Sequence, residues 1–311
     1  MIDMSVVTAI KNEEENIEEY LERLYNTLRK LEISYEIIFV TDVNEDRTYE
    51  VLKEKNRKDS RLKIIKLSRG YGQYTAIMAG LDYASGNVVV TMDSDLQDHP
   101  EDIEGLYEKL QEGYDIVYGI KEKKDDSLIR NVLSGFYLWV LNALSDVKLD
   151  HNTNIFRIMS LRTVRAIRSF SEHAPSLTGI SSLIGLPTTS LKVTSGTRKK
   201  GKTKYSYLAL FSLAFDTIFS FTVKPLRMIS LLGVTVSCLS LIYLIVDLVR
   251  TFFFAQNVVP GWPTVISFII FLGGVQLVSL GIIGEYVGRS YIEAKKRPLY
   301  IVEEKIGEFH V

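Results

Sequence analysis

Short apolar runs alternate with amphipathic segments along the first 120 residues of the chain. Apolar runs rich in Val and Ile predict buried strands, whereas apolar positions spaced three and four residues apart predict helices. We therefore expect an α/β domain with a mainly parallel sheet and helices on both faces. The predicted strands are residues 5–10, 36–40, 62–67, 88–92 and 116–118, and the predicted helices are 14–31, 49–56, 74–84 and 102–111.

The regular alternation ends near residue 120. Beyond it we expect a helix at 127–144, a strand at 156–159 and a helix at 161–169. Residues 195–204 form a basic loop that contains glycine, and large apolar side chains recur at helical spacing in residues 205–221. Because this last segment precedes a long apolar stretch, we expect an amphipathic helix that lies in the membrane interface.

Two apolar stretches, residues 228–254 and 262–287, are each long enough to cross a bilayer. A crossing takes about 20 predominantly apolar residues. Lys and Arg flank the start of the first stretch and the end of the second, and the connecting segment 255–261 has neither. This asymmetry predicts a membrane hairpin with both ends in the cytoplasm, in which Glu285 is placed to pair with Arg289. Two buried helices of a soluble protein are the alternative, which the length, low charge and basic flanks disfavour.

The composition argues against several other classes of protein. A formal net charge of −1 gives no basic field for binding nucleic acid. Cys238 is the only cysteine, so no disulfide can form within one chain. The N-terminus shows no secretory signal pattern, and we expect the N-terminal domain to stay in the cytoplasm. The expected organisation is a domain at 1–204, a juxtamembrane helix at 205–227, a two-helix transmembrane hairpin at 228–288 and a cytoplasmic tail at 289–311.

Asp93 and Asp95 follow the predicted strand 88–92. Ligands of parallel sheets bind beyond the carboxyl ends of the strands. Two carboxylates at such a position can hold Mg²⁺ or Mn²⁺, which prefer oxygen ligands and often bridge to a diphosphate. The alternative is an Asx-type turn, with Asp98 capping the helix that begins after Pro100. The two interpretations are compatible.

Polar side chains also follow the first two predicted strands. Asn12 and Glu13 come after the first strand, and Asp42 comes after the second. Taken singly, helix capping explains them, with Asn12 capping a helix that starts near Glu13. Taken together with Asp93 and Asp95, they bring acids from three strand ends to one crevice. A nucleotide-sugar site is then the better explanation.

The basic loop precedes the predicted interfacial helix and contains Arg198, Lys199, Lys200, Lys202 and Lys204. A solvated run of charge is the ordinary explanation of such a segment. Its place near a membrane surface favours contact with phosphate, from lipid headgroups or from a lipid-phosphate substrate. Candidates for the other wall of an anion pocket are Lys121, Arg130 and Ser134.

Six segments spread over nearly the whole chain carry a resemblance to a known family. They are KNEEENI (11–17), LSRGYGQYTAIMAGLDYASG (67–86), MDSDLQDHPEDI (92–103), KTKYSYLAL (202–210), FSFTVKPLR (219–227) and IGEYVGRSYIEAKKRPLYIVEE (283–304). The chain resembles the polyprenyl-phosphate glycosyltransferases of glycosyltransferase family 2, which include bactoprenol glucosyltransferases and dolichol-phosphate mannose synthases. The resemblance implies a Rossmann-like GT-A fold with Mg²⁺ or Mn²⁺. It also implies inverting sugar transfer from a nucleotide diphosphate to a polyprenyl phosphate.

The resemblance also assigns roles to residues by position. The metal set is Asp93, Asp95 and Gln97. The nucleotide-sugar set is Ala9, Asn12, Glu13, Asp42, Gln73, Asp93 and Ser94. The acceptor-phosphate set is Lys121, Arg130, Ser134, Arg198 and Lys204. The residues expected to carry catalysis are Asp93, Asp95 and Arg198.

The chain departs from the family pattern at two places. Thr41 and Val43 replace an Asp and a Gly after the second strand, and Ile155 replaces an Asp often proposed as a base. A phosphate monoester has its second pKa near 6, so the acceptor is already largely ionised at neutral pH. Such a nucleophile does not need a general base. We therefore expect retained activity with an altered substrate preference or rate.

The resulting hypothesis is a multi-pass enzyme of the bacterial inner membrane, with its catalytic domain and both termini in the cytoplasm. The bacterial type of C-terminus favours a UDP-sugar such as UDP-glucose as donor and undecaprenyl phosphate as acceptor. The resemblance and the glycines of the second apolar stretch also suggest a homo-oligomer, a dimer or tetramer. One alternative is a catalytically degenerate scaffold that binds a nucleotide sugar without turnover. A processive polysaccharide synthase is disfavoured, because neither Trp139 nor Trp262 lies in a Gln-x-x-Arg-Trp motif.

Overall fold

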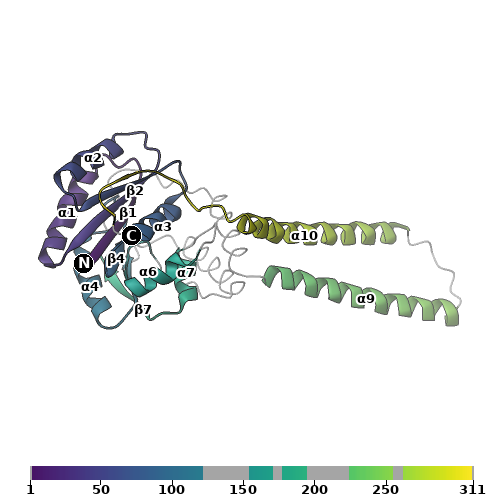
Figure 1. Ribbon diagram of the computed structural model, residues 1–311. Helices are drawn as coiled ribbons and strands as arrows, with labels where there is room; N and C mark the ends of the chain where they lie inside the picture. Colours follow the sequence, from purple (N-terminus) through teal and green to yellow (C-terminus); the bar gives the residue numbers. More distant parts are fainter. Residues whose placement is uncertain (1, 122–153, 171–176, 195–223, 255–261, 310–311) are drawn as a thin grey trace. The chain divides into compact units, whose positions relative to one another are not determined.

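The computed structural model describes residues 2–121, 154–170, 177–194, 224–254 and 262–309 (Figure 1). They belong to two compact units. One is an α/β domain in which the N-terminal part of the chain is joined by the C-terminal residues Pro298–Val311. The other contains the two long helices that precede these C-terminal residues.

One eight-stranded sheet forms the centre of the α/β domain. Its strands are β1 (Met4–Ile10), β2 (Tyr35–Thr41), β3 (Leu62–Leu67), β4 (Val88–Thr91), β5 (Ile116–Lys121), β6 (Arg157–Ser160), β7 (Thr188–Val193) and β8 (Val302–Ile306). Their order in the sheet is β7-β5-β6-β4-β1-β2-β3-β8. The strands β4, β1, β2 and β3 run parallel, and β5 and β7 pair parallel, whereas β6 and β8 are antiparallel to their neighbours. The predicted mainly parallel sheet is confirmed.

Helices cover both faces of this sheet, as the sequence predicts (Figure 1). They are α1 (Ile17–Lys30), α2 (Thr48–Lys58), α3 (Gln73–Tyr83), α4 (Ile103–Gln111), α6 (Leu161–Arg168) and α7 (Leu177–Ile184), with a short 3₁₀ turn, η1 (Pro100–Asp102), before α4. On one face α1 and α4 bury Leu24 and Leu106 in an apolar cluster. On the other face α3, α6 and α7 bury Ile77, Val164 and Ile180.

Helix α3 lies unusually close to the sheet because of Gly80. A Cβ atom at this position would lie 2.3 Å from Cγ1 of Val7 and 3.0 Å from Cγ2 of Val40. Only the absence of a side chain allows this approach to β1 and β2. The contact sets the distance of α3 from β1 and β2, and the first residue of this helix, Gln73, lies at the carboxyl end of the parallel strands.

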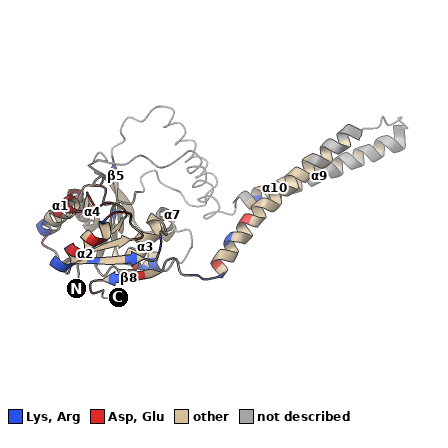
Figure 2. Cartoon of the chain, turned by 90° about the horizontal axis from the view of Figure 1, so that it is seen from above, with Lys and Arg blue, Asp and Glu red and all other residues tan. Residues whose placement is uncertain are grey.

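The two long helices are α9 (Lys224–Phe254) and α10 (Trp262–Ala294). Charged side chains on α10 gather towards its C-terminal end (Figure 2), where Arg289 lies 2.7 Å from Glu285 as predicted. Among the described residues, the 24-residue stretch Phe271–Ala294 is long and apolar enough to cross a membrane, and Leu226–Val236 is a shorter apolar stretch. The second crossing therefore stays a prediction. The predicted helices at 127–144 and 205–221 lie outside the described residues.

The sequence pattern did not predict β7 or β8. Strand β8 follows α10 and pairs with β3 at one edge of the sheet, so the last part of the chain completes the fold of the first. Its charged side chains reach neighbouring elements: Lys66 lies 2.7 Å from Glu303, and the hydroxyl of Tyr49 donates to Glu304 at 2.5 Å. This strand has three exposed charged residues in a row between two half-buried apolar side chains, and no apolar run marks it in the sequence.

A buried ion pair and a hydrogen bond to it join the parallel strands β1, β2 and β3. Lys63 in β3 and Glu36 in β2 approach to 2.6 Å, and their side chains are 5% and 1% exposed. Glu36 also accepts hydrogen bonds from the hydroxyl of Ser5 at 2.5 Å and from the backbone N–H of Ser85 at 2.7 Å. Burial alone would raise the pKa of Glu36, but these hydrogen bonds and Lys63 outweigh it, and the pKa is lowered. Its contribution to stability is thus present above pH 4.5 and is lost as acid protonates it.

We expect Lys63→Met to lower the free energy of unfolding by about 3–5 kcal/mol, because it leaves the charge of Glu36 buried without its partner. The double variant with Glu36→Leu should recover part of this loss, since no charge is then left buried. As a control, Lys66→Met breaks an exposed pair and should cost less than about 1 kcal/mol. Chemical unfolding of the purified full-length protein, followed by circular dichroism, measures these differences. Equal losses for Lys63→Met and Lys66→Met would contradict the prediction.

Candidate active site

The acids predicted to form a crevice lie at the carboxyl ends of β1, β2 and β4. Asp93 follows β4, and Gln73 at the start of α3 donates its side-chain N–H to Asp93 Oδ1 at 2.7 Å. The backbone N–H of Asp93 lies 3.5 Å from a carboxylate oxygen of Asp98. Lys121, the last residue of β5, reaches the other oxygen of Asp98 at 2.7 Å. Four side chains from three separate parts of the chain thus form one polar network.

Negative charge accumulates around Asp93. Burial is the main cause of its raised pKa, and the like charges of Asp98 and Asp95 add to it. Lys121 and the hydrogen bond from Gln73 offset only part of this effect, and the pKa of Asp93 is raised to about 7. A carboxylate so perturbed by neighbouring acids at the end of a strand is typical of a functional site. The group that would relieve the repulsion is a cation.

The residues present fit a divalent metal that arrives with a phosphate ligand. Among the described residues, no three His, Cys, Asp or Glu side chains are arranged to hold a metal by themselves. Mg²⁺ and Mn²⁺ sites of this kind use one or two carboxylates and complete the shell with water and substrate phosphates. Asp93 and Asp95 therefore fit a metal that also binds a diphosphate.

The turn after β4 also agrees in part with the capping interpretation. Asp95 Oδ1 accepts a hydrogen bond from the backbone N–H of Gln97 at 3.0 Å, and Leu96 between them has a positive φ of 61°. This is an Asx-type turn, as expected. The expectation that Asp98 caps the next helix is wrong, because Asp98 is 1% exposed and points to Asp93 and Lys121 instead. Its burial opposite Lys121 makes it part of the polar network.

The loops after β1 and β2 are tied to each other by two asparagines. Asn12 has a positive φ of 55°, and its backbone N–H donates to the side chain of Asn44 at 3.0 Å. In return, the side chain of Asn12 accepts from the backbone N–H of Glu45 at 2.8 Å. Helix α1 begins at Ile17, so the expectation that Asn12 caps a helix starting near Glu13 is wrong. Asn12 instead sets the distance between the two loops.

The same tie explains one departure from the family pattern. Thr41 is 1% exposed, and its hydroxyl accepts from the side-chain N–H of Asn44 at 2.7 Å. Thr41 therefore stabilises the loop that follows β2, and its buried side chain does not face a ligand. Asp42 is the remaining acid at this strand end, and it lies 3.2 Å from Lys11. The backbone at Gly70 also lies close to Asp42, since a Cβ at position 70 would be 3.1 Å from a carboxylate oxygen of Asp42.

The other residues predicted to contact the donor occupy compatible positions. Ala9 lies in β1 and packs against the apolar cluster under α3. The carboxylate of Glu13 accepts from Asn16 at 2.5 Å, and its backbone N–H donates to Thr48 at 2.9 Å. Ser94 is buried beside Asp93. These residues lie at the strand ends, but their contacts with a donor stay a prediction.

Only one member of the predicted acceptor site can be placed. Lys121 is paired with Asp98. Arg130, Ser134, Arg198 and Lys204 lie outside the described residues, and so does the rest of the basic loop. The acceptor-phosphate pocket and the catalytic role of Arg198 therefore stay predictions.

Sequence reasoning missed three charged residues near this edge of the sheet. Lys11 pairs with Asp42, and Asp98 pairs with Lys121. Arg157 in β6 is fully buried, 5.0 Å from the ring of Tyr118, and two of its nitrogens have no hydrogen-bond partner among the described residues. Burial lowers the pKa of Arg157. For Arg157, the signal in the sequence was a single charged residue at the start of an otherwise apolar strand.

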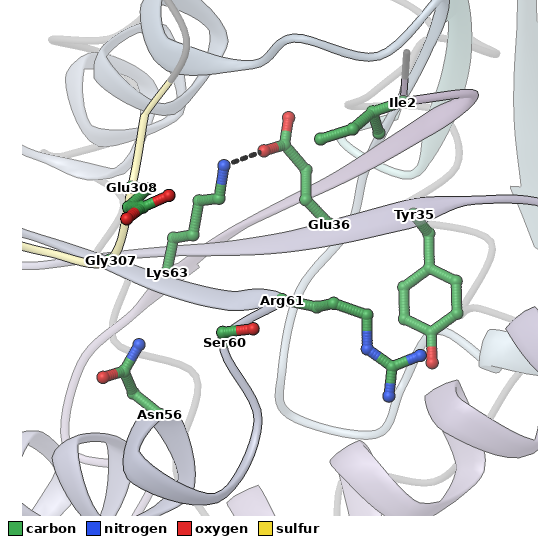
Figure 3. Close-up of a pocket in the computed structure, with 9 residues that line it drawn as sticks. All are labelled: Ile2, Tyr35, Glu36, Asn56, Ser60, Arg61, Lys63, Gly307 and Glu308. Carbon is green, nitrogen blue, oxygen red and sulfur yellow. Dashed lines mark ion pairs between the residues drawn. The ribbon is translucent and has the colours of Figure 1, made fainter.

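A separate cavity of about 350 Å³ lies at the opposite, amino end of β2 and β3 (Figure 3). Its charged side chains include Lys63 and Glu36, which face each other in the ion pair already described. Arg61 donates two hydrogen bonds to the carboxylate of Asp59 and lies 4.6 Å from the ring of Tyr35. Because these charges are paired within the protein, the cavity has a structural explanation, and it is far along the sheet from the acids at the strand ends.

Comparisons with known proteins identify relatives of this chain over nearly its whole length. Residues 5–167 match the model for glycosyl transferase family 2, and residues 224–290 match the GtrB C-terminal hairpin. The chain is 39% identical over 307 residues to an uncharacterised glycosyltransferase of Synechocystis, with 98% of this chain and 96% of the relative covered. It is 34% identical over 305 residues to a bactoprenol glucosyl transferase of Shigella phage SfV, with 97% and 98% covered. It is 33% identical over 308 residues to an undecaprenyl-phosphate 4-deoxy-4-formamido-L-arabinose transferase of Pectobacterium atrosepticum, with 98% and 94% covered.

Solved structures show the same fold. A crystal structure of glucosyl-3-phosphoglycerate synthase from Mycobacterium tuberculosis with UDP matches with a TM-score of 0.50 and 17% identity, over 70% of this chain and 79% of that chain. The same synthase with Mn²⁺, UDP and phosphoglyceric acid matches with a TM-score of 0.50 and 18% identity, over 70% and 76%. Identity this low supports the fold alone, and the predicted GT-A-like architecture is confirmed.

We expect Mn²⁺ to bind about tenfold more weakly for each pH unit below 7, because the metal requires the ionised form of Asp93 and its pKa is raised to about 7. Above that pH the affinity should level off. Asp98→Asn removes a like charge, so it should move the midpoint to lower pH. Calorimetric titration of the full-length protein with Mn²⁺ in the presence of UDP, from about pH 5.5 to about pH 8, measures both effects. An affinity that does not change with pH would contradict the prediction.

Proposed function

Because the chain belongs to glycosyltransferase family 2, we propose that it transfers a sugar, with inversion, from a UDP-sugar such as UDP-glucose to undecaprenyl phosphate at the cytoplasmic face of a membrane. The chain is a glycosyltransferase of the polyprenyl-phosphate group, as its relatives of the same length indicate. The UDP held by a structural neighbour fits the proposed donor.

One observation carries the proposal for the donor site. Asp93 lies with Asp95 and Asp98 at the end of β4, and its pKa is raised to about 7. An acidic cluster that fits a divalent metal, beside Asp42 and the loops after β1 and β2, suits a nucleotide diphosphate with its metal. The parallel-sheet edge is also where such ligands bind in open α/β folds.

The residues around Asp93 would bind the sugar donor and its leaving diphosphate, and they do not activate the acceptor phosphate. The metal, when bound, would stabilise the negative charge that develops on the leaving diphosphate. Asp93 and Asp95 would hold it, and Gln73 keeps the Asp93 carboxylate in place through its hydrogen bond. Lys121 pairs with Asp98 and reduces the repulsion that the cluster would otherwise suffer.

The transfer itself is a single displacement. An oxygen of the acceptor phosphate forms a bond to the anomeric carbon as the bond from that carbon to the diphosphate oxygen breaks, and the electron pair leaves with the diphosphate. The acceptor oxygen is already ionised at neutral pH, so no proton has to be removed. This agrees with Ile155, which is apolar and packs against the cluster under α3 rather than offering a base.

The position of β8 supports two membrane crossings. Strands β3 and β8 pair in one sheet, so the chain before α9 and after α10 lies on the same side of any membrane. An even number of crossings must therefore separate them. The stretch within α10 that is long and apolar enough to cross then requires a partner, and α9 is the other long apolar helix among the described residues.

A scaffold that binds a nucleotide sugar without turnover is the second candidate. The apolar Ile155 and the buried Thr41 favour it, because both stand where the family pattern has an acid. The two candidates differ in one outcome: the scaffold binds UDP with Mn²⁺ but forms no lipid-linked sugar.

We expect the purified protein to form a lipid-linked sugar from labelled UDP-glucose, undecaprenyl phosphate and Mn²⁺. Asp93→Asn should lower the turnover by at least about 10²-fold, because it weakens the stabilisation of the leaving diphosphate. Asp59→Asn, which removes a carboxylate at the opposite end of the sheet, should leave the turnover unchanged. No product with any common nucleotide sugar, or equal activity of both variants, would contradict the proposal.

Cysteine labelling tests the hairpin. In a Cys238→Ser background, Asn257→Cys is expected to react with a membrane-impermeant maleimide in intact cells, because the segment 255–261 should lie outside the cytoplasm. Glu308→Cys, in the part of the chain that completes the sheet, should react only after lysis. Labelling of position 257 only after lysis would contradict two crossings.

A further inference from the structure

The C-terminal tail, residues 298–309, contacts the segment of the α/β domain that faces the proposed donor site. This segment consists of the donor loop, residues 68–72, and helix α3, which begins at the next residue. The tail follows α10, which ends at Ala294, so it connects the helical unit to the sheet.

Two neighbouring tail residues make these contacts. The carbonyl oxygen of Ile301 accepts from the backbone N–H of Ser68 at 2.9 Å. The hydroxyl of Tyr300 donates to Asp82 Oδ2, near the end of α3, at 2.7 Å. The tail therefore holds the donor loop by its backbone and α3 by a side chain.

The opposite side of the same segment meets the acids of the crevice. The backbone at Gly70 lies so close to Asp42 that a Cβ would be 3.1 Å from its carboxylate. Gln73, the first residue of α3, donates to Asp93 at 2.7 Å. A displacement of α3 or the donor loop would therefore change the position of groups beside both Asp42 and Asp93.

The contact between Tyr300 and Asp82 is not what keeps α3 folded. Arg168 in α6 donates to the carbonyl oxygens of Leu81 and Ala84 and so satisfies the C-terminal end of this helix. Gly80 fixes the helix against the sheet by close packing. Removal of the Tyr300 hydroxyl should thus leave α3 folded and at the same distance from the sheet, and allow only a shift along the sheet.

We infer that Tyr300 is a positioning residue for donor binding, which it achieves by holding α3 from the C-terminal tail, while its neighbour Ile301 holds the donor loop. This inference rests on the proposed donor site at Asp42 and Asp93. Its consequence is that the part of the chain leaving the helical unit sets the affinity for the nucleotide sugar without touching it.

Tyr300→Phe in the full-length protein, reconstituted in lipid nanodiscs, tests the inference. We expect the KM for UDP-glucose and the Kd for UDP with Mn²⁺ to rise about threefold to tenfold. The kcat and the KM for undecaprenyl phosphate should stay within about twofold of their original values, since the reacting groups are unchanged. Asp82→Asn keeps an oxygen that accepts from Tyr300 and should retain near-original affinity, whereas Asp82→Ala should behave like Tyr300→Phe.

Tyr49→Phe is the matched control. It also removes a hydrogen bond from a tyrosine hydroxyl to a carboxylate, between α2 and Glu304 of the same tail, but away from the donor loop. It should leave the Kd for UDP with Mn²⁺ unchanged. The inference is overturned if Tyr300→Phe binds UDP with the original affinity, or if both tyrosine variants weaken it equally. Failure of the unmodified protein to transfer sugar would count against the proposed function, while the UDP affinities still test the role of Tyr300.

Discussion

The repulsion between the neighbouring carboxylates after β4 is the interaction on which the proposed site depends. Asp93, Asp95 and Asp98 lie within six residues of one another after β4, and burial strengthens their mutual repulsion. Lys121 and a hydrogen bond from Gln73 offset only part of this repulsion. What remains is a site in which the pKa of Asp93 is raised and which fits a divalent cation.

The second constraint is that the C-terminal strand β8 must pair with a sheet whose other strands all precede the two long helices. Strand β8 pairs with β3 after two long helices, so the domain is complete only when the C-terminal tail has joined it. This connection links the helical unit to the donor side of the crevice through Tyr300 and Ile301. The two long helices are thus inserted along the chain between two strands of one sheet, rather than attached after its last strand.

The loops at the strand ends show how a departure from a family pattern can be accommodated. Thr41 replaces an acid, but Asn44 donates to its hydroxyl, and Asn12 binds Asn44 in turn. The two loops keep a fixed separation, and Asp42 stays at the crevice with Lys11 beside it. Ile155 is accommodated differently, by packing into the apolar cluster under α3. Both changes leave the acids after β4 untouched.

The sequence by itself determined the parallel core, both long helices and the acids at the strand ends. It did so because a strand buried on both faces requires a continuous apolar run, and because each polar residue that ends such a run must lie at the same edge of the sheet. Only the tertiary structure decided that β8 completes the sheet, that Asp98 pairs with Lys121, and that Asn12 ties two loops instead of capping a helix. These features depend on contacts between residues far apart in the chain, and an exposed edge strand or a buried charge pair leaves no periodic pattern from which to predict it.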